Sequence, residues 1–192
     1  MSDSLALAAD ATAALAADRR RLVAVDGIDG AGKSTFADSL APLIERPVVR
    51  ASTDDFHNPR AVRYRRGRES AEDYYLDSFD LAALTSLLLT PFAAGEPFCR
   101  RAFDYREDTP VPAEVEDAPD DAILVLDGLF LHRSALRDRW DLSIWLDVPA
   151  DIAAERLLLR NRQPPRDRYI RGNELYIAEA RPADNASLVL PW

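Results

Sequence analysis

Hydrophobic residues along this 192-residue chain follow two alternating patterns. Short runs rich in valine, isoleucine and leucine are typical of strands buried on both faces of a parallel sheet. We predict such strands at residues 21–26, 47–51, 122–127, 142–148 and 186–190. Between them, apolar residues recur at helical spacing in residues 36–44, 69–75, 78–89, 150–160 and 170–179. The alternation predicts one domain over residues 1–192, with a three-layer α/β fold around a mainly parallel central sheet.

Two of these helices have apolar faces that can be assigned to individual residues. The face of the helix over residues 78–89 is predicted to consist of Leu81, Leu84, Leu87 and Leu88. In the helix that follows Pro149, the inward residues are predicted to be Ile152, Leu157 and Leu158. We interpret both sets as parts of the core.

An alanine-rich segment at positions 4–18 precedes the first strand. It lacks the basic start of a secretory signal peptide, and Asp10 and Asp18 interrupt its apolar run. We therefore interpret residues 1–20 as a surface helix, which either covers the sheet or pairs subunits into a homo-oligomer. The arginines at positions 19–21 are interpreted as a solvated helix end.

One glycine-rich segment carries the strongest chemical signal. Residues 27–34 fit G-x-x-x-x-G-K-[ST], the phosphate-binding P-loop, and lie between a predicted strand and a predicted helix. The alternative, a glycine turn followed by a chance Lys-Ser pair, does not account for both flanks. In a P-loop, Lys33 reaches the β- and γ-phosphates of ATP and the Ser34 hydroxyl binds Mg²⁺. We expect the ATP contacts to come from Gly27, Asp29, Gly30, Ala31, Gly32, Lys33, Ser34 and Thr35.

Acidic residues follow two further strands. Asp54, Asp55 and His57 come after the second strand, where open α/β sheets bind ligands. A carboxylate there either accepts the proton of an attacking hydroxyl or caps the next helix. Asp127 ends the clearest apolar strand, and in a P-loop domain such a carboxylate helps to hold Mg²⁺.

Two segments are rich in arginine. Residues 60–68 are either a flap that binds phosphate or substrate, or a solvated loop. Residues 160–168 are either a solvated loop or a lid whose arginines stabilise the transferring phosphoryl group. With a P-loop in the same domain, we favour the lid.

Charge and cysteine content narrow the functional classes. The formal net charge of −9 argues against non-specific nucleic-acid binding, which needs a basic face. The single cysteine, Cys99, excludes an internal disulfide framework and fits a reducing cytoplasm. No apolar run reaches the length of a membrane span.

The sequence resembles the uridine kinase and phosphoribulokinase family of P-loop kinases from about Leu22 onward, and also looks related to nicotinamide riboside kinases and bacterial pantothenate kinases. The resemblance is carried by the P-loop, by residues 54–57 and 126–128, and by residues 136–140 through 146–151. It implies a P-loop NTP hydrolase-like fold, with Asp54 as the base that deprotonates the acceptor and Asp55 as the fallback. It further implies that Asp127 lies near Mg²⁺ and that residues 160–171 form a lid containing Arg160, Arg162 and Arg166.

The family pattern also implies an acceptor site. Residues 103–105 match an aromatic-Asp-aromatic segment that borders the nucleoside base in uridine kinases. We expect acceptor contacts from Asp55, His57, Tyr74, Phe103 and Tyr105, and catalytic roles for Asp54, Lys33 and Arg162. Three positions depart from the pattern: Asp108 replaces a histidine, residues 73–74 replace the ribose-binding aspartate, and the lid carries Pro164-Pro165.

The resulting prediction is a kinase that uses ATP and Mg²⁺ to phosphorylate a hydroxyl of a small molecule. A nucleoside or other riboside is the first expected acceptor; nicotinamide riboside, pantothenate and sugars are the alternatives. A nucleotide-binding regulatory module is the alternative from another class, and it would bind nucleotide without acceptor-dependent turnover.

Overall fold

Five parallel strands form the centre of the protein, in the order β2-β5-β1-β6-β7. A computed structural model describes residues 2–192. The strands are β1 (Arg21–Gly27), β2 (Val48–Ser52), β5 (Ile123–Gly128), β6 (Leu142–Asp147) and β7 (Leu188–Pro191). The strand predictions are therefore confirmed to within a few residues. β1 is central and pairs with β5 on one side and β6 on the other.

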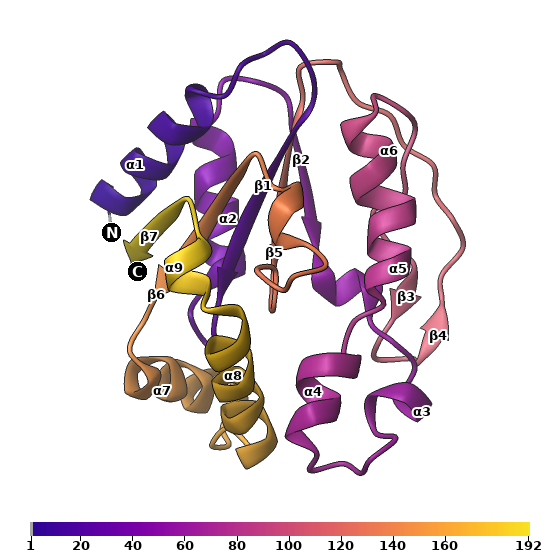
Figure 1. Ribbon diagram of the computed structural model, residues 1–192, viewed down its shortest axis with the longest axis vertical. Helices are drawn as coiled ribbons and strands as arrows, with labels where there is room; N and C mark the ends of the chain where they lie inside the picture. Colours follow the sequence, from indigo (N-terminus) through magenta and orange to yellow (C-terminus); the bar gives the residue numbers. More distant parts are fainter. Residues whose placement is uncertain (1) are drawn as a thin grey trace.

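Both faces of the sheet are buried, because alternate residues of each strand point to opposite sides. Val23 and Val25 of β1 contact one core, which the helices α1 (Ser2–Ala13) and α2 (Lys33–Leu40) cover. Leu22 and Ala24 contact a second core on the other face. Figure 1 shows α1 and α2 on one side of the strands and the helices α5 (Leu81–Ala83) and α6 (Thr90–Ala93) on the other. The three-layer prediction is confirmed.

A π-helical turn alters the helix that covers the second core. α5 (Leu81–Ala83), η3 (Leu84–Leu89) and α6 (Thr90–Ala93) follow one another without a break, and η3 is π-helical. The wider turn shifts the residues that follow it around the helix axis. Leu84, Leu88 and Leu89 are therefore buried, whereas Leu87 is 38% exposed. The placement of Leu87 in the core is wrong, because regular α-helical spacing does not hold here.

Three helices of the C-terminal half connect β6 to β7. α7 spans Ala150–Asn161, α8 spans Asp167–Ala180 and the short α9 spans Pro182–Asn185. Only Ala153 and Leu157 of α7 are buried; Ile152 and Leu158 are exposed, which corrects the inward face predicted for them. Residues 162–166 connect α7 to α8, so the non-helical part of the predicted lid is short.

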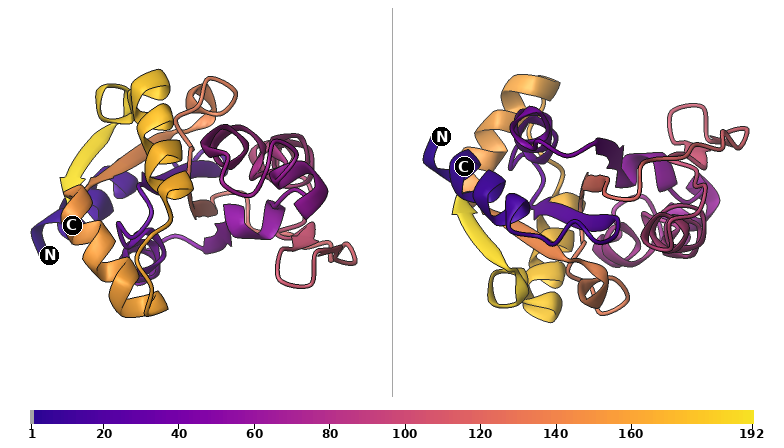
Figure 2. Two further views of the ribbon diagram at one scale, coloured as in Figure 1. Left: turned by 90° about the horizontal axis from the view of Figure 1, so that it is seen from below. Right: turned by 90° about the horizontal axis from the view of Figure 1, so that it is seen from above.

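The segment between β2 and β5 lies opposite these helices. It contains the turn η2 (Thr53–Phe56), α3 (Arg60–Arg63), α4 (Ala71–Asp77) and a small hairpin of β3 (Phe103–Asp104) and β4 (Thr109–Pro110). α4 packs against α8 through a third apolar cluster that includes Tyr75, Phe130 and Tyr176. The left view of Figure 2 looks at this end, with α7 and α8 on one side and α3 and α4 on the other.

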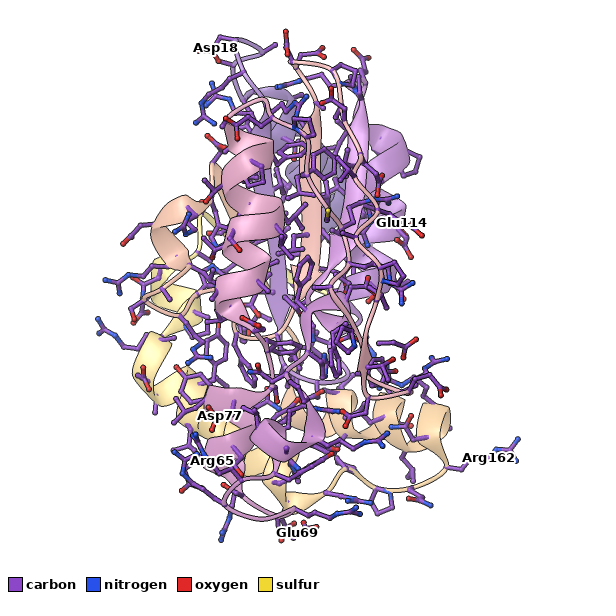
Figure 3. All side chains as sticks on the ribbon, turned by 90° about the vertical axis from the view of Figure 1, so that its right-hand side faces the viewer. Asp18, Arg65, Glu69, Asp77, Glu114 and Arg162 are labelled. Atoms are coloured by element: carbon purple, nitrogen blue, oxygen red, sulfur yellow. The ribbon has the colours of Figure 1, made fainter. Side chains whose placement is uncertain are left out.

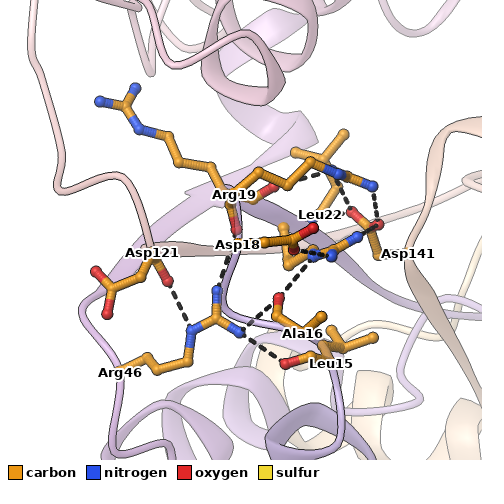
Figure 4. A network of polar contacts seen from close by, with 10 residues as sticks. Leu15, Ala16, Asp18, Arg19, Leu22, Arg46, Asp121 and Asp141 are labelled. Carbon is orange, nitrogen blue, oxygen red and sulfur yellow. Dashed lines mark hydrogen bonds and ion pairs between the residues drawn. The ribbon is translucent and has the colours of Figure 1, made fainter.

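A network of arginines lies at the other end of the sheet, beside the N-terminal end of β1. Arg19 and Arg21 both form ion pairs with Asp141, and Arg46 donates hydrogen bonds to the backbone oxygens of Asp121 and Leu15 (Figure 4). Arg20 is buried, pairs with Asp117 at 2.6 Å and donates to three backbone carbonyls. The solvated position predicted for these arginines is therefore wrong for Arg20, whereas Arg19 remains exposed.

None of the helices in residues 2–192 combines the length and the apolar character that spanning a bilayer requires.

Candidate active site

The P-loop connects β1 to α2 and needs glycine at its tightest points. Gly30 and Gly32 have φ angles of +81° and +87°, in the region that side chains with a Cβ rarely adopt. A Cβ on Gly30 would lie 2.3 Å from the carbonyl oxygen of Ala153 in α7. The loop encloses a cavity of about 320 Å³, called here the phosphate cavity, lined by Asp29, Gly30, Gly32, Lys33, Ser34 and Thr35 together with residues of other elements.

Gly27 and Ala31, two of the predicted ATP contacts, stabilise the loop and do not line the cavity. The Ala31 side chain is buried, and its backbone amide donates to the carbonyl of Ile28 at 3.0 Å. The carbonyls of Gly27 and Ile28 accept hydrogen bonds from Lys33 Nζ at 3.1 and 2.9 Å. These two contacts hold the ammonium group across the loop, where it lines the phosphate cavity.

Ser34 and Asp127 lie together, as the sequence predicted. The Ser34 hydroxyl donates to one carboxylate oxygen of Asp127 at 2.6 Å, and Arg50 contacts the other at 2.7 Å. A hydroxyl and a carboxylate beside a phosphate site are the donors that Mg²⁺ takes, with phosphate oxygens and waters completing its shell. Within residues 2–192 no group of three or more His, Cys, Asp or Glu side chains could hold a metal by itself. The donor set therefore fits a metal bound jointly with the nucleotide.

Asp54 projects from the turn η2, directly after β2. The Ser52 side chain accepts a hydrogen bond from the Asp54 amide, so Ser52 caps this turn. Gly128 allows the turn to approach β5, because a Cβ there would lie 2.2 Å from Thr53 Oγ1. Asp54 is thereby brought close to Asp127 and to the phosphate cavity.

The surroundings of Asp54 raise the pKa of its carboxyl group. The main cause is burial within the walls of the site, although solvent still reaches the side chain through the cavities. The negative charges of Asp127 and Asp29 raise the pKa further, while the Lys33 ammonium group opposes them. A carboxylate with a raised pKa is a stronger proton acceptor than an ordinary aspartate.

A second cavity of about 540 Å³, called here the acceptor cavity, adjoins the first. Asp29, Asp54 and Arg160 line both cavities. His57, Tyr74 and Tyr105, three of the predicted acceptor contacts, line the acceptor cavity, as does Arg166 of the predicted lid. A carboxylate shared by a phosphate cavity and a second cavity can reach a group bound in either one.

Aromatic rings surround His57. Its ring stacks on Tyr105 with centroids 5.0 Å apart and meets Phe79 edge-on at 4.6 Å. Burial, aided by the positive charge of Arg63, lowers the His57 pKa to about 4. The ring is therefore neutral at physiological pH and forms part of an uncharged wall.

Asp29 of the P-loop is held from two helices. Tyr74 of α4 donates to its carboxylate, and Asn173 of α8 donates to the same oxygen at 2.9 Å. Burial and the Asp29 charge hold the Tyr74 pKa well above its usual range, so the phenol remains a donor. Sequence reasoning missed Asn173, because a single asparagine within a helical pattern carries no local signal.

A buried cluster lies directly beneath the P-loop. Asp26, the last residue before the loop, accepts hydrogen bonds from His132 Nδ1 at 2.7 Å and from the Tyr176 hydroxyl of α8. It also binds the backbone amides of Gly27 and Leu131. α8 therefore contacts the P-loop region twice, through Tyr176 below it and through Asn173 beside it.

Besides Gly27 and Ala31, three predicted site residues lie outside both cavities. The Asp55 carboxylate pairs with Arg101 at 2.8 Å, and Phe103 is buried. Arg162 caps α7 in a left-handed conformation, and Figure 3 shows its side chain extending into solvent away from the molecule. The structure gives none of these three a place beside the reacting groups. The phosphate cavity gains Arg156 instead, one turn of α7 before Arg160.

The P-loop lies at the C-terminal ends of the parallel strands, and a second cavity adjoins the phosphate cavity. This is the arrangement expected of a P-loop kinase, which binds a nucleotide and a small acceptor side by side. The sequence model of the Phosphoribulokinase / Uridine kinase family matches residues 22–176, and the chain belongs to this family. It is accordingly an ATP-dependent small-molecule kinase, as the sequence predicted.

Relatives support the same assignment at low identity. The chain is 28% identical over 174 residues to a uridine kinase of Alkaliphilus metalliredigens, covering 86% of this chain and 80% of that one. It is 29% identical over 147 residues to a uridine kinase of Shewanella piezotolerans, with coverages of 73% and 68%. A solved structure of a possible uridine kinase from Bacillus stearothermophilus has a TM-score of 0.80 at 24% identity and covers 98% of each chain.

Proposed function

We propose that the protein transfers the γ-phosphoryl group of ATP to a hydroxyl of a small metabolite bound in the acceptor cavity. The observation that carries the proposal is that Asp54 lines both cavities. A base in this position can contact an acceptor hydroxyl while the hydroxyl oxygen faces the terminal phosphate.

The proposed reaction is an in-line displacement. Asp54 accepts the proton of the hydroxyl as its oxygen forms a bond to the γ-phosphorus. The bond from that phosphorus to the β-bridging oxygen breaks, and ADP leaves. Lys33 and Arg160 offset the negative charge that develops on the transferring group. Mg²⁺ bound with the nucleotide by Ser34 and Asp127 would neutralise part of the phosphate charge.

The acceptor expected from the family resemblance is a nucleoside or other riboside, and uridine is the name that the curated relatives carry. The contacts in the cavity give this expectation limited support. Asp73, in the region expected to bind ribose, is buried and accepts hydrogen bonds from Arg66 instead of lining the cavity. We therefore propose the nucleoside as the first compound to test, with sugars and pantothenate as the alternatives.

ADP release from MgATP tests the proposal. The acceptors are uridine, cytidine, nicotinamide riboside, pantothenate, and simple sugars with their phosphates. Release that depends on one acceptor supports the kinase and identifies its substrate. Tight ATP binding without release on any acceptor would contradict it and favour the regulatory module.

A pair of variants tests the assignment of the base. Asp54→Asn is expected to lower kcat by about 10²- to 10⁴-fold, the usual contribution of a general base, while ATP still binds. Asp55→Asn is the matched variant, since it removes the neighbouring carboxylate, which pairs with Arg101 outside the cavities. A loss of turnover confined to Asp55→Asn would reverse the assignment.

A further inference from the structure

Positive charge is concentrated in the acceptor cavity of an otherwise acidic protein. The whole chain has 33 acidic and 24 basic residues. The lining of this cavity contains only two acidic residues, Asp29 and Asp54, against six arginines: Arg60, Arg63, Arg106, Arg160, Arg166 and Arg168. The lid accounts for Arg160 and Arg166, which leaves four arginines of this cavity without an assigned role.

Arg168, in the first turn of α8, is the least compensated of these charges. The residue is only 3% exposed, and within residues 2–192 its guanidinium group forms no ion pair. Its Nη1 donates to the carbonyl of Arg68 at 2.8 Å, and its Nε has no hydrogen-bond partner. Its guanidinium lies 4.8 to 5.4 Å from the ring centres of Tyr64, Tyr74 and Tyr169. Aromatic faces attract a cation, but they do not neutralise it.

Arg63 of α3 provides a second buried guanidinium group in the same cavity. It is 8% exposed, its Nε is also without a partner, and its ion pair with Asp108 is 3.2 Å long. Its guanidinium lies 5.6 Å from the centre of the Tyr64 ring and that of Arg168 lies 4.8 Å from it, so α3 and α8 each place a cation beside this ring. Arg63 has one partly buried carboxylate as counter-ion and Arg168 has none, so an anion bound by both groups would offset the cost of burying them.

The P-loop does not account for these two residues. The phosphate cavity has its own cations, Lys33, Arg156 and Arg160. Arg63 and Arg168 line the acceptor cavity alone. The cations of the phosphate cavity are therefore sufficient to bind the phosphates of ATP, and Arg63 and Arg168 are free to contact the acceptor.

We propose that the acceptor carries an anionic group, a carboxylate or a phosphate ester, which Arg63 and Arg168 bind. The planar guanidinium fork suits either group, because both can accept two parallel hydrogen bonds. The inference rests on the proposed kinase activity; it replaces the neutral nucleoside, as the favoured acceptor, with hydroxy compounds that are negatively charged.

Direct binding of simple anions tests the site without turnover. Protein saturated with MgADP is titrated calorimetrically with inorganic phosphate and with acetate, which represent the two anion classes. At least one of them is expected to bind, with affinity about 10- to 100-fold lower in Arg168→Gln. Arg171→Gln is the matched control, since Arg171 lies on the same helix with an exposed side chain outside both cavities. Absence of binding, or equal binding to Arg168→Gln, would overturn the inference.

Turnover with matched acceptors tests the consequence. Pantothenate is compared with the neutral pantothenol, and ribose 5-phosphate with ribose. The charged member of at least one pair is expected to be preferred, through a lower KM. Arg168→Gln should reduce kcat/KM for that member about 10- to 100-fold and leave its neutral partner nearly unchanged. A merely structural role would reduce both alike. Arg63→Gln, on a different helix, repeats the test if Arg168→Gln fails to fold.

The two proposals fail in different ways. Turnover by the wild type of neutral acceptors only, with no charged acceptor used, would retain the kinase and reject the anionic acceptor. Anion binding that depends on Arg168, without turnover of any acceptor, would retain the anion site and reject the proposed function.

Discussion

At the scale of single residues, Asp54 has the position and the environment expected of a base. Its pKa is raised, mainly by burial and then by Asp127 and Asp29. The carboxyl group must lose its proton before it can accept another from the acceptor. The acid limb of kcat/KM against pH should therefore lie above about 3.9, the ordinary aspartate value. A pH–rate profile with saturating MgATP checks this, and a limb at or below that value would contradict it.

His57 should titrate far below an ordinary histidine. Its pKa is lowered to about 4, first by burial and then by Arg63. Because the unfolded chain binds this proton more readily, the fold should lose stability as pH falls from about 6.5 towards 4. NMR titration measures the midpoint directly, with His57→Gln identifying the signal beside that of His132. A midpoint near 6.5 would mean that the ring is freely hydrated.

The residues predicted from the sequence agree with the lining of the phosphate cavity where the site is contiguous. The P-loop glycines, Lys33 and Ser34 lie in one short segment, and Asp127 is marked by its place at the end of an apolar strand. Prediction from the sequence failed where the direction of a side chain determines whether the residue reaches a cavity. Arg160 and Arg162 are two positions apart, yet one lines both cavities and the other extends into solvent from the helix end. Arg168 falls in the predicted arginine-rich segment 160–168, but the sequence does not distinguish it there, because its significance comes from burial among three tyrosines.

At the scale of elements, the close approach of β5 to η2 controls where Asp54 lies. Gly128→Ala would place a Cβ 2.2 Å from Thr53 Oγ1 and 2.4 Å from its Cγ2, which forces the turn to move. A displacement near 1 Å costs about 10²-fold in rate, so kcat should fall by about that factor while ATP affinity changes less. Kinetics and nucleotide titration of the same variant separate the two effects.

A second substitution provides the control. Adding Thr53→Ala to Gly128→Ala removes the two nearest atoms, so activity should partly return. No recovery in the double variant would show that Gly128 acts through something other than this contact.

Elements were predictable wherever local periodicity determines them. The strands are apolar on both faces, and a run of that kind fits only a buried parallel strand here. The π-helical turn of η3 was not predictable, since it changes which leucines are buried without changing the sequence pattern. The joining of α4 and α8 through Asp29 depends on tertiary contact and has no local signature.

At the scale of the whole molecule, the two ends of the parallel strands have separate roles. The C-terminal ends of the strands border both cavities, and the N-terminal ends border the arginine network around Arg20. Arg20→Ala would remove a buried side chain together with an ion pair and three hydrogen bonds to backbone carbonyls, and should cost about 2–3 kcal/mol, lowering Tm by about 5–10 °C. Activity per folded molecule should be unchanged. Thermal unfolding checks the stability.

Arg19→Ala is the comparison for that measurement. The Arg19 side chain is 46% exposed, and its pair with Asp141 should contribute at most about 1 kcal/mol. Equal losses of Tm in the two variants would contradict the special role of the buried guanidinium group.

The central position of β1 has a consequence for how the chain is made. β1 ends at Gly27, but both of its neighbours come from residues 123–147. During synthesis, roughly 100 further residues must therefore be translated after this apolar strand before either partner strand emerges from the ribosome. A nascent chain in that state exposes an unpaired strand, which favours aggregation and engagement by chaperones. The nucleotide site can form only after most of the protein has been translated, although its defining motif is among the first parts made.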